Sequence, residues 1–256
     1  MPISRRRLFQ LIDLYQGDCL EIMPSIPDNS VDMILADLPY EITAAKFDIL
    51  IPFEPLWIQY NRIARENAAM VFTASQPFTT ALISSNLKNF RYEWIWEKPQ
   101  GTNPMVAKYQ PLKSHENIVV FYRKSPTYNP QMTLSTPYGG FKSTKKKLGE
   151  VYGDLKSEHR DNPEGSRYPK TVIKFKQEKG LHPTQKPLAL MEYLIKTYTN
   201  EGDVILDNVF GSGTSGAAAK KTGRSYIGME LNENYFKIGS ERINKTPAPN
   251  ALDMLF

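Results

Sequence analysis

The stretch that decides the fold is residues 204–219, VILDNVFGSGTSGAAA. In it a short apolar run ends at Asp207, and a glycine-rich turn leads into an alanine-rich segment typical of a helix. Glycines permit a tight turn and let the backbone approach a ligand that a Cβ atom would exclude. The string GSGTSG matches the pattern GxGxxG, and Glu230 ends the next apolar run, where an acid can accept two ribose hydroxyls. These residues alone leave three interpretations open: a dinucleotide site, a nucleoside-type cofactor site or a plain glycine turn.

Apolar runs and amphipathic segments alternate on both sides of this stretch. Residues 31–37 and 69–74 are typical of buried strands, and residues 52–68 between them have the pattern of an amphipathic helix. Residues 187–201 place apolar side chains at helical spacing. Further strands are expected at 92–98, 117–123 and 225–230, and a final helix at 232–243. Repeated strand–helix–strand units predict an α/β fold with a mostly parallel sheet covered on both faces.

The positive charge of the chain is concentrated in one segment. The 256 residues are 41% hydrophobic and 23% charged, which is typical of a globular protein, and the formal net charge is +5. Residues 125–180 contain eleven Lys or Arg and six Asp or Glu, so they carry the whole of that excess. Because this segment also lacks apolar periodicity, we expect an insertion between two halves of one core, residues 1–124 and 181–256. Its charge favours an acidic partner such as nucleic acid.

Composition excludes several classes of protein. The single cysteine, Cys19, excludes an internal disulfide, and three scattered histidines argue against a metal site. No apolar run approaches the ~20 residues of a membrane span, and the first residues lack a secretory signal pattern. We therefore expect a soluble cytoplasmic protein with no metal and no membrane partner.

A second motif, ADLPY at residues 36–40, follows the apolar run 31–35. Asp-Leu-Pro-Tyr resembles the Asp-Pro-Pro-Tyr signature of S-adenosylmethionine-dependent amino-methyltransferases that act on adenine in DNA. GDCLE precedes it, and WIWEKPQGTNP, SHENIVVFYRK, HPTQKP and GSGTSG follow. This order, with the catalytic signature first and the cofactor loop last, resembles the beta class of that family, including prokaryotic and phage enzymes, over roughly residues 15–242. The resemblance implies a Rossmann-like class I methyltransferase with a mixed, mostly parallel seven-stranded sheet.

The resemblance also implies how the catalytic residues act. The Asp37 carboxylate and the Leu38 main-chain carbonyl would accept the two hydrogens of the adenine N6 amine. Pro39 would shape the turn, and Tyr40 would stack on an adenine that has been flipped out of the duplex. A hydrogen bond to a charged acceptor contributes about 1.5–3 kcal/mol. No metal is needed for this chemistry.

A larger set of residues is expected to bind S-adenosylmethionine. By resemblance, Glu230 would hold the ribose, and Asp18 and Cys19 would meet the adenine ring. Asp207 and Thr214 would lie near the methionine end, which His182, Thr184 and Lys186 of HPTQKP would close. The full set is Asp18, Cys19, His182, Thr184, Lys186, Asp207, Phe210, Gly211, Ser212, Gly213, Thr214 and Glu230.

The inserted segment is the expected target recognition region for double-stranded DNA. The basic residues assigned to DNA are Lys145, Lys146, Lys147, Arg160 and Arg167. Adjacent lysines suit phosphates, which supply affinity without sequence information, whereas planar arginines suit base edges. Asn129, Gln131 and Asn162 are further candidates for reading bases. A homodimer and a cognate restriction endonuclease stay open as partners.

Alternatives remain at this level. N4-cytosine methylation uses equivalent chemistry, although Asp37 rather than Ser at the head of the tetrapeptide favours adenine. Glu41 stands where the family commonly has glycine, and Asn208 stands where it commonly has proline, so a catalytically weak DNA-binding relative is a second alternative. A nicotinamide oxidoreductase, the third alternative, rests on GSGTSG alone and leaves ADLPY unexplained.

Replacing Lys145, Lys146 and Lys147 by Gln is expected to weaken DNA binding and flatten its salt dependence. Each lost phosphate contact lowers the slope of log K against log[salt] by about 0.9. Titration of a labelled duplex at several salt concentrations measures that slope, and unchanged affinity for S-adenosylmethionine is the control. An unchanged slope would show that these lysines do not contact DNA.

Overall fold

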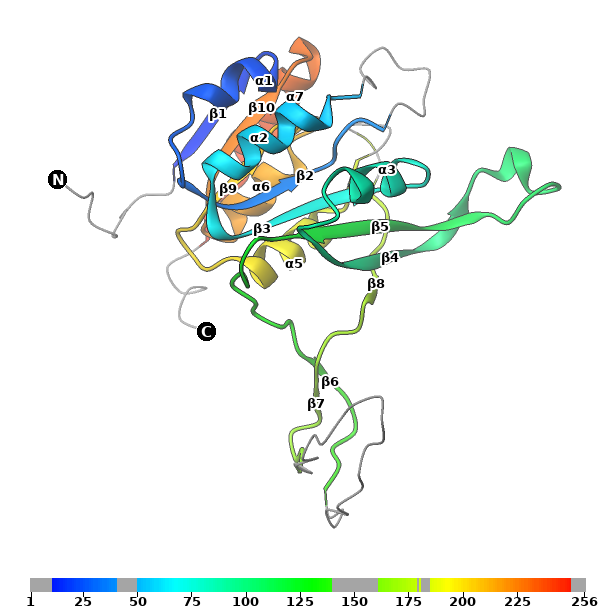
Figure 1. Ribbon diagram of the computed structural model, residues 1–256. Coiled ribbons are helices and arrows are strands. Elements are labelled where there is room, and N and C mark those ends of the chain that lie inside the picture. The colour runs from blue at the N-terminus through cyan, green and yellow to red at the C-terminus, as the bar shows by residue number, and fades with distance from the viewer. Residues whose placement is uncertain (1–10, 41–49, 140–160, 179, 181–184, 250–256) are drawn as a thin grey trace. The chain divides into compact units, whose positions relative to one another are not determined.

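The computed structural model describes residues 11–40, 50–139, 161–178, 180 and 185–249. The chain divides into two compact units, one made of Met1–Asn129 and Thr171–Phe256 and the other of Pro130–Lys170 (Figure 1). The larger unit holds a central sheet with helices on both faces. None of the described helices is long and apolar enough to cross a bilayer.

The elements follow the order that the sequence pattern predicts. The strands are β1 (Ile12–Gln16), β2 (Val31–Ala36), β3 (Ala64–Ala74), β4 (Phe90–Thr102), β5 (Lys113–Phe121), β6 (Thr133–Leu134), β7 (Ser166–Arg167), β8 (Val172–Lys174), β9 (Val204–Asp207) and β10 (Ser225–Glu230). The helices are α1 (Cys19–Ile22), α2 (Phe53–Ile63), α3 (Phe78–Ser85), α5 (Leu188–Tyr198), α6 (Thr214–Lys221) and α7 (Glu233–Lys245), with short 3-10 turns at Met23–Ser25 and Pro104–Val106. One helix is shorter than expected: α2 ends at Ile63 because Ala64 already pairs with Val31 of β2.

The sheet order is β1-β10-β9-β2-β3-β5-β4-β8. The strands β1, β10, β9, β2 and β3 run parallel to one another, and β5 runs antiparallel to both β3 and β4. The predicted α/β class is confirmed, and the sheet has eight described strands, one more than the predicted seven. The extra strand is β8, which lies within the predicted insertion and pairs with the outer edge of β4. Because the parallel strands point the same way, their carboxyl ends share one edge of the sheet.

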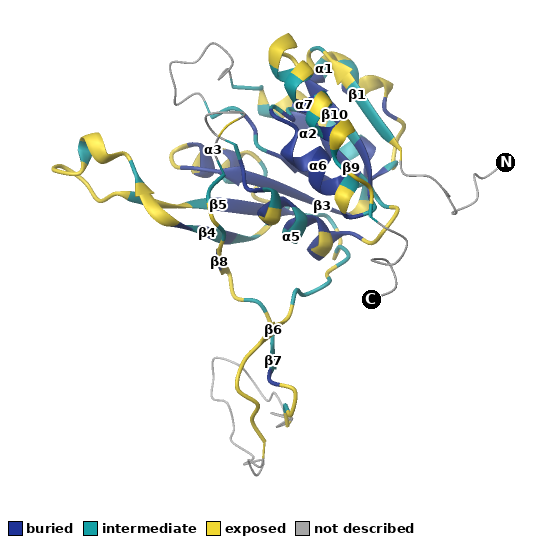
Figure 2. Ribbon diagram, turned by 180° about the vertical axis from the view of Figure 1, so that it is seen from behind, coloured by how far each residue is buried: buried dark blue, intermediate teal, exposed yellow. Residues whose placement is uncertain are grey.

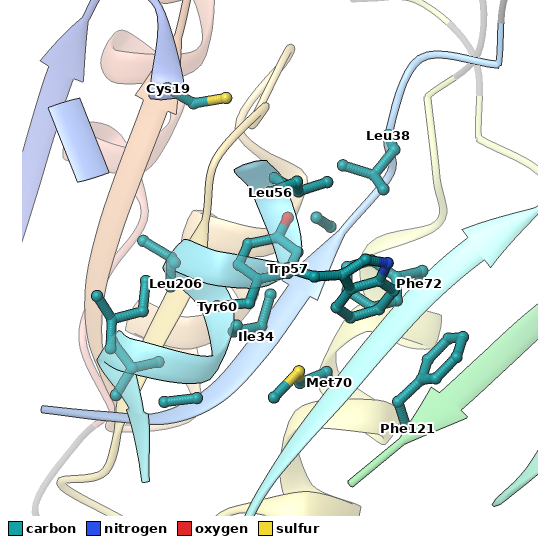
Figure 3. Close-up of a cluster of buried hydrophobic side chains, with 14 of the residues drawn as sticks. Cys19, Ile34, Leu38, Leu56, Trp57, Tyr60, Met70, Phe72, Phe121 and Leu206 are labelled. Atoms are coloured by element: carbon teal, nitrogen blue, oxygen red, sulfur yellow. The ribbon is translucent and has the colours of Figure 1, made fainter. Parts of the chain in front are cut away.

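Two apolar layers enclose the sheet, and successive residues of the central strands alternate between them. On β2, Ile34 packs toward α2 while Met33 and Leu35 pack toward α5 and α6. Leu56 and Tyr60 of α2 fill the first layer, which Figure 3 shows in close-up. The centres of the strands are buried on both faces (Figure 2). The apolar runs of the sequence therefore correspond to doubly covered strands.

The smaller unit, Pro130–Lys170, lies inside the predicted insertion of residues 125–180. Its described residues include the two-stranded sheet of β6 and β7. Asn129, just before the unit, belongs to the larger one, because its backbone N–H donates to the Thr197 carbonyl at 2.7 Å and its side-chain amide donates to the Thr199 carbonyl at 3.0 Å. Asn129 therefore caps the end of α5, and this contact argues against its expected role in reading DNA bases.

Candidate active site

A cavity of about 1200 Å³ lies at the carboxyl edge of the sheet. Its lining includes the segment after β2, the glycine loop after β9 and the acid at the end of β10. In open α/β sheets, ligands bind at this edge where the chain order reverses. The volume exceeds the roughly 300–1,000 Å³ of common small-molecule pockets, so it has room for two ligands side by side.

Asp37 is the most heavily bonded residue of the cavity. Its Oδ1 accepts hydrogen bonds from the hydroxyls of Tyr40, at 2.7 Å, and Thr73. Its Oδ2 accepts from the Lys186 ammonium at 2.5 Å. The carboxylate keeps partial access to the cavity because its side chain is 29% exposed. The Asp37 acceptor is therefore held in one orientation by three donors from three parts of the chain.

Lys186 contacts Asp37, whereas the resemblance places it at the methionine end of the cofactor. Its ammonium is 7% exposed and lies 3.5 Å from Oε2 of Glu116 as well as against Asp37. Burial lowers the pKa of Lys186, but the two carboxylates outweigh burial and raise it overall. Lys186 is therefore a permanent cation beside Asp37.

The sequence motifs include two further charged residues of this cluster, but their spacing assigns no role to them. Lys98, near the carboxyl end of β4, donates to Oε1 of Glu116 at the start of β5. Burial raises the pKa of Glu116, but Lys186, Lys98 and Lys113 outweigh burial and lower it. In the sequence, the signal for Lys98 and Glu116 was that each is a charged residue next to an apolar strand run. The antiparallel pairing of β4 with β5 is what brings this pair to the catalytic edge.

Tyr40 is held by a second aromatic ring. Its ring stacks on Phe78 of α3, with centroids 4.9 Å apart and planes 24° from parallel. Burial, together with Asp37 and Glu116, raises the pKa of the Tyr40 hydroxyl well above its usual value. The hydroxyl is therefore a neutral donor to Asp37.

The glycine loop and Glu230 build the other half of the cavity. One carboxylate oxygen of Glu230 accepts from the Gly211 N–H at 2.9 Å, and the other accepts from the Asn232 N–H at 2.8 Å. Gly213 has φ of 74°, and a Cβ atom there would lie 2.6 Å from the Gly239 carbonyl oxygen. The loop can therefore pack against α7 only with glycine at this position.

The residues of this half fit S-adenosylmethionine. Gly211 has φ of 51°, and the nearest atom to a Cβ there would be the Val209 carbonyl oxygen at 4.0 Å, so the loop leaves a cradle that a side chain would fill. Asp18, Asp207 and Glu230 line the same cavity and provide acceptors for an amino group and hydroxyls. The described residues contain no cluster suited to a metal ion.

Asp207 is 4% exposed and binds the polypeptide itself. One oxygen accepts from the Val209 N–H at 3.0 Å, and the other accepts from the Ser215 hydroxyl, which also contacts the Tyr226 hydroxyl. Burial raises the pKa of Asp207 to about 7, although the hydrogen bonds from Ser215 and Val209 oppose that rise. Its charge therefore changes near neutral pH.

Asn208 joins three elements of the core beneath the cavity. Its side-chain oxygen accepts from the buried Tyr60 hydroxyl at 2.6 Å, and its amide donates to Cys19 Sγ at 3.3 Å. Asn208 therefore makes two buried hydrogen bonds at a position where proline is common and would instead restrict the backbone of the turn.

Asp18, which lines the same cavity, is the N-cap of α1, because its side chain accepts from the Leu20 N–H at 2.8 Å.

Arg242 is a residue that the sequence did not indicate. Its guanidinium donates to Thr214 Oγ1 at 2.7 Å and to the Ser212 carbonyl at 3.4 Å, so α7 holds the start of α6. Phe210 is buried, and its ring packs on Phe236 of α7. Arg242 is visible only after folding because it is 28 residues from Thr214.

Most of the predicted DNA contacts lie outside the residues that the structure describes. Of the residues assigned to DNA, those outside the described residues are Lys145, Lys146, Lys147 and Arg160. The cofactor candidates His182 and Thr184 also lie outside them, as does Glu41. The Arg167 guanidinium lies over the Tyr138 ring, 4.6 Å from its centroid, and donates to the Thr136 carbonyl at 2.6 Å. Asn162 donates to and accepts from Ser166. Arg167 and Asn162 therefore stabilise the smaller unit in this conformation.

The Asp207→Asn variant is expected to change how stability depends on pH. The ordinary pKa of Asp is 3.8 and that of folded Asp207 is about 7, so between these values the unfolded chain is ionised first and the native state loses stability as pH rises. The variant lacks this loss, so its advantage over wild type should grow up to pH 7 and then stay constant. The change is at most about 4 kcal/mol, since each pKa unit corresponds to about 1.4 kcal/mol.

Urea unfolding of the cofactor-free protein from pH 4 to 8 measures this difference. The variant Glu54→Gln removes an exposed acid of α2 and serves as the control. Curves for wild type and Asp207→Asn that run parallel between pH 4 and 7 would show that Asp207 is ionised in the native state throughout.

Known DNA methyltransferases are similar to this chain in sequence and in structure. A family model described as DNA methylase matches residues 31–241. The DNA adenine methyltransferase YhdJ of Escherichia coli (strain K12) is 30% identical, over 90% of this chain and 82% of the relative, and type II methyltransferase M1.MboII of Moraxella bovis is 28% identical, over 89% and 95%. The solved M1.HpyAVI–SAM complex has a TM-score of 0.62 at 26% identity and covers 91% of this chain and 100% of that one. The family model covers most of the chain, so this protein belongs to the DNA methylase family.

Proposed function

We propose that this DNA methylase transfers a methyl group from S-adenosylmethionine to the exocyclic N6 amine of a flipped adenine in double-stranded DNA. The observation that carries the proposal is one cavity lined both by the Asp37–Tyr40 segment and by the glycine loop with Glu230. A relative at 30% identity, YhdJ, is named a DNA adenine methyltransferase.

The base half of the cavity is suited to an exocyclic amine. Such an amine is a weak nucleophile because its lone pair is delocalised into the ring. Acceptors at Asp37 and the Leu38 carbonyl would draw its hydrogens and favour a tetrahedral nitrogen, and they act best when preorganised. Thr73 supplies that preorganisation for Asp37, and Lys186 holds the carboxylate before the base enters. Phe78 holds the Tyr40 ring in place for stacking on the base.

The cofactor half would hold S-adenosylmethionine, which supplies a methyl group on a sulfonium with a good leaving group. The Glu230 carboxylate would accept hydrogen bonds from the ribose hydroxyls. It would use the lone pairs that the N–H groups of Gly211 and Asn232 do not occupy. Asp207 would face the methionine ammonium, which favours its ionised form. Asp18 and Cys19 would contact the adenine ring. Alignment of the two ligands in one cavity is then the main contribution of the protein.

DNA contacts would come mainly from residues 125–180, the most basic segment of the chain. Lys145, Lys146 and Lys147 would contact phosphates, and Arg160 would read base edges. Arg167 would do so only after leaving Tyr138. A homodimer and a cognate restriction endonuclease remain predictions from the resemblance.

The direct test is transfer of a labelled methyl group from S-adenosylmethionine to unmethylated genomic DNA, followed by digestion and nucleoside analysis. We expect N6-methyladenine. N4-methylcytosine would move the activity to the other exocyclic amine. No product from folded protein that binds S-adenosylmethionine would refute the catalytic proposal.

Tyr40→Ala is expected to lower turnover while leaving the Kd for S-adenosylmethionine unchanged. Stacking of one base on an aromatic ring contributes about 1–3 kcal/mol, which corresponds to a loss of roughly 5- to 150-fold. Tyr40→Phe is the matched control, because it keeps the ring and removes only the hydrogen bond to Asp37, so its loss should be much smaller. Equal losses in the two variants would show that the hydroxyl, and not stacking, is what matters.

A further inference from the structure

Glu116 belongs to the charged cluster beside Asp37, and one of its carboxylate oxygens accepts no hydrogen bond from the described residues. Oε1 of Glu116 accepts from Lys98, whereas the buried Oε2 has no hydrogen-bond partner among the described residues. The nearest cation to Oε2 in the ion pairs of this site is the Lys186 ammonium, at 3.5 Å. A buried carboxylate oxygen without a donor is costly, so such a group in a native structure calls for an explanation.

Asp37, the other acid of the cluster, has hydrogen-bond donors on both of its carboxylate oxygens. Asp37 already receives two hydroxyls on Oδ1 and the Lys186 ammonium on Oδ2. In the proposed reaction the amine of the base needs an acceptor on this same carboxylate. The acceptor site left on Asp37 is the second lone pair of Oδ2, the oxygen that already receives the Lys186 ammonium, so an amine that enters there displaces the ammonium from its close contact. A buried ammonium without a partner would cost several kcal/mol.

We propose that Glu116 is a positioning residue that receives the Lys186 ammonium when the target amine takes its place at Asp37. The inference rests on the proposed function, because it describes how that site admits its base. The movement needed is small, since closing 3.5 Å to an ordinary charge-assisted distance of about 2.8 Å shifts the ammonium by less than about 1 Å. The ammonium stays paired with a carboxylate at both ends of this movement.

Lys98 makes Glu116 suitable for this task. It occupies Oε1 and therefore leaves Oε2 as the oxygen that faces Lys186. Lys98 is also 8% exposed, so the pair is shielded from water and its orientation is restricted. Glu116 acts on the reaction through Lys186 and Asp37, and it has no proposed contact with the base or the cofactor.

The test compares Glu116→Gln and Glu116→Asp with wild type in labelled methyl transfer to unmethylated genomic DNA. Glutamine keeps a carbonyl oxygen for Lys98 but offers an amide in place of the free carboxylate oxygen. We expect kcat to fall on the order of 10- to 100-fold in Glu116→Gln, with KM for DNA, the Kd for S-adenosylmethionine and Tm within about twofold or a few degrees of wild type. Glu116→Asp keeps the charge and should restore most of kcat.

Glu93→Gln is the matched control, because this β4 acid accepts from Asn117 at 2.8 Å and has no ion pair with Lys186. It should behave as wild type. An unchanged kcat in Glu116→Gln, or an equal fall in the Gln and Asp variants with intact Tm, would overturn the inference while the proposed function stands. A wild-type protein that methylates no DNA would refute the proposed function and the inference with it.

Discussion

The pairing of β2 with β9 is the constraint on which the active site depends. Met33 and Ile34 pair with Ile205 and Leu206, and the Asp32 carboxylate accepts from the Val204 N–H at 3.0 Å. These contacts join a strand near the start of the chain to one near its end. Because the two strands are parallel and adjacent, the segments that follow them share one edge of the sheet. The base half and the cofactor half therefore become one cavity.

Burial affects the acids of this cavity in two ways. Glu116 and Asp37 lie among the ammonium groups of Lys98 and Lys186, so their charges are compensated. Asp207 has hydrogen-bond donors but, among the residues that the structure describes, no cation beside it, and burial raises its pKa to about 7. The difference follows from position in the sheet: β4, β5 and the segment before α5 supply lysines at one end, whereas the loop after β9 supplies amides and hydroxyls. The base half is thus charged and preorganised, and the cofactor half can respond to a bound cation.

The core accommodates the departure from the family pattern at Asn208 by hydrogen bonding. Asn208 occupies a position where the resemblance leads one to expect proline, and it uses its amide to bond Tyr60 and Cys19. Tyr60 is fully buried, so its hydroxyl needs an acceptor, and Asn208 provides one. Gly213 of the loop has no room for a side chain because α7 approaches it too closely. Backbone geometry is therefore more restricted here than side-chain identity.

The sequence by itself determined the type and order of the elements, the loop at Gly211 and Gly213, and the place of the DLPY segment after a strand. These features depend on local periodicity and on the conformational freedom of glycine, which short stretches express. Only the tertiary structure decided that Lys186 contacts Asp37, 149 residues away, and that Glu116 lies beside them. The helix boundary at Ile63 and the strand β8 were likewise decided by pairing partners. The physical reason is that electrostatic partners depend on which strands become neighbours, and long-range strand pairing leaves no mark in local residue spacing.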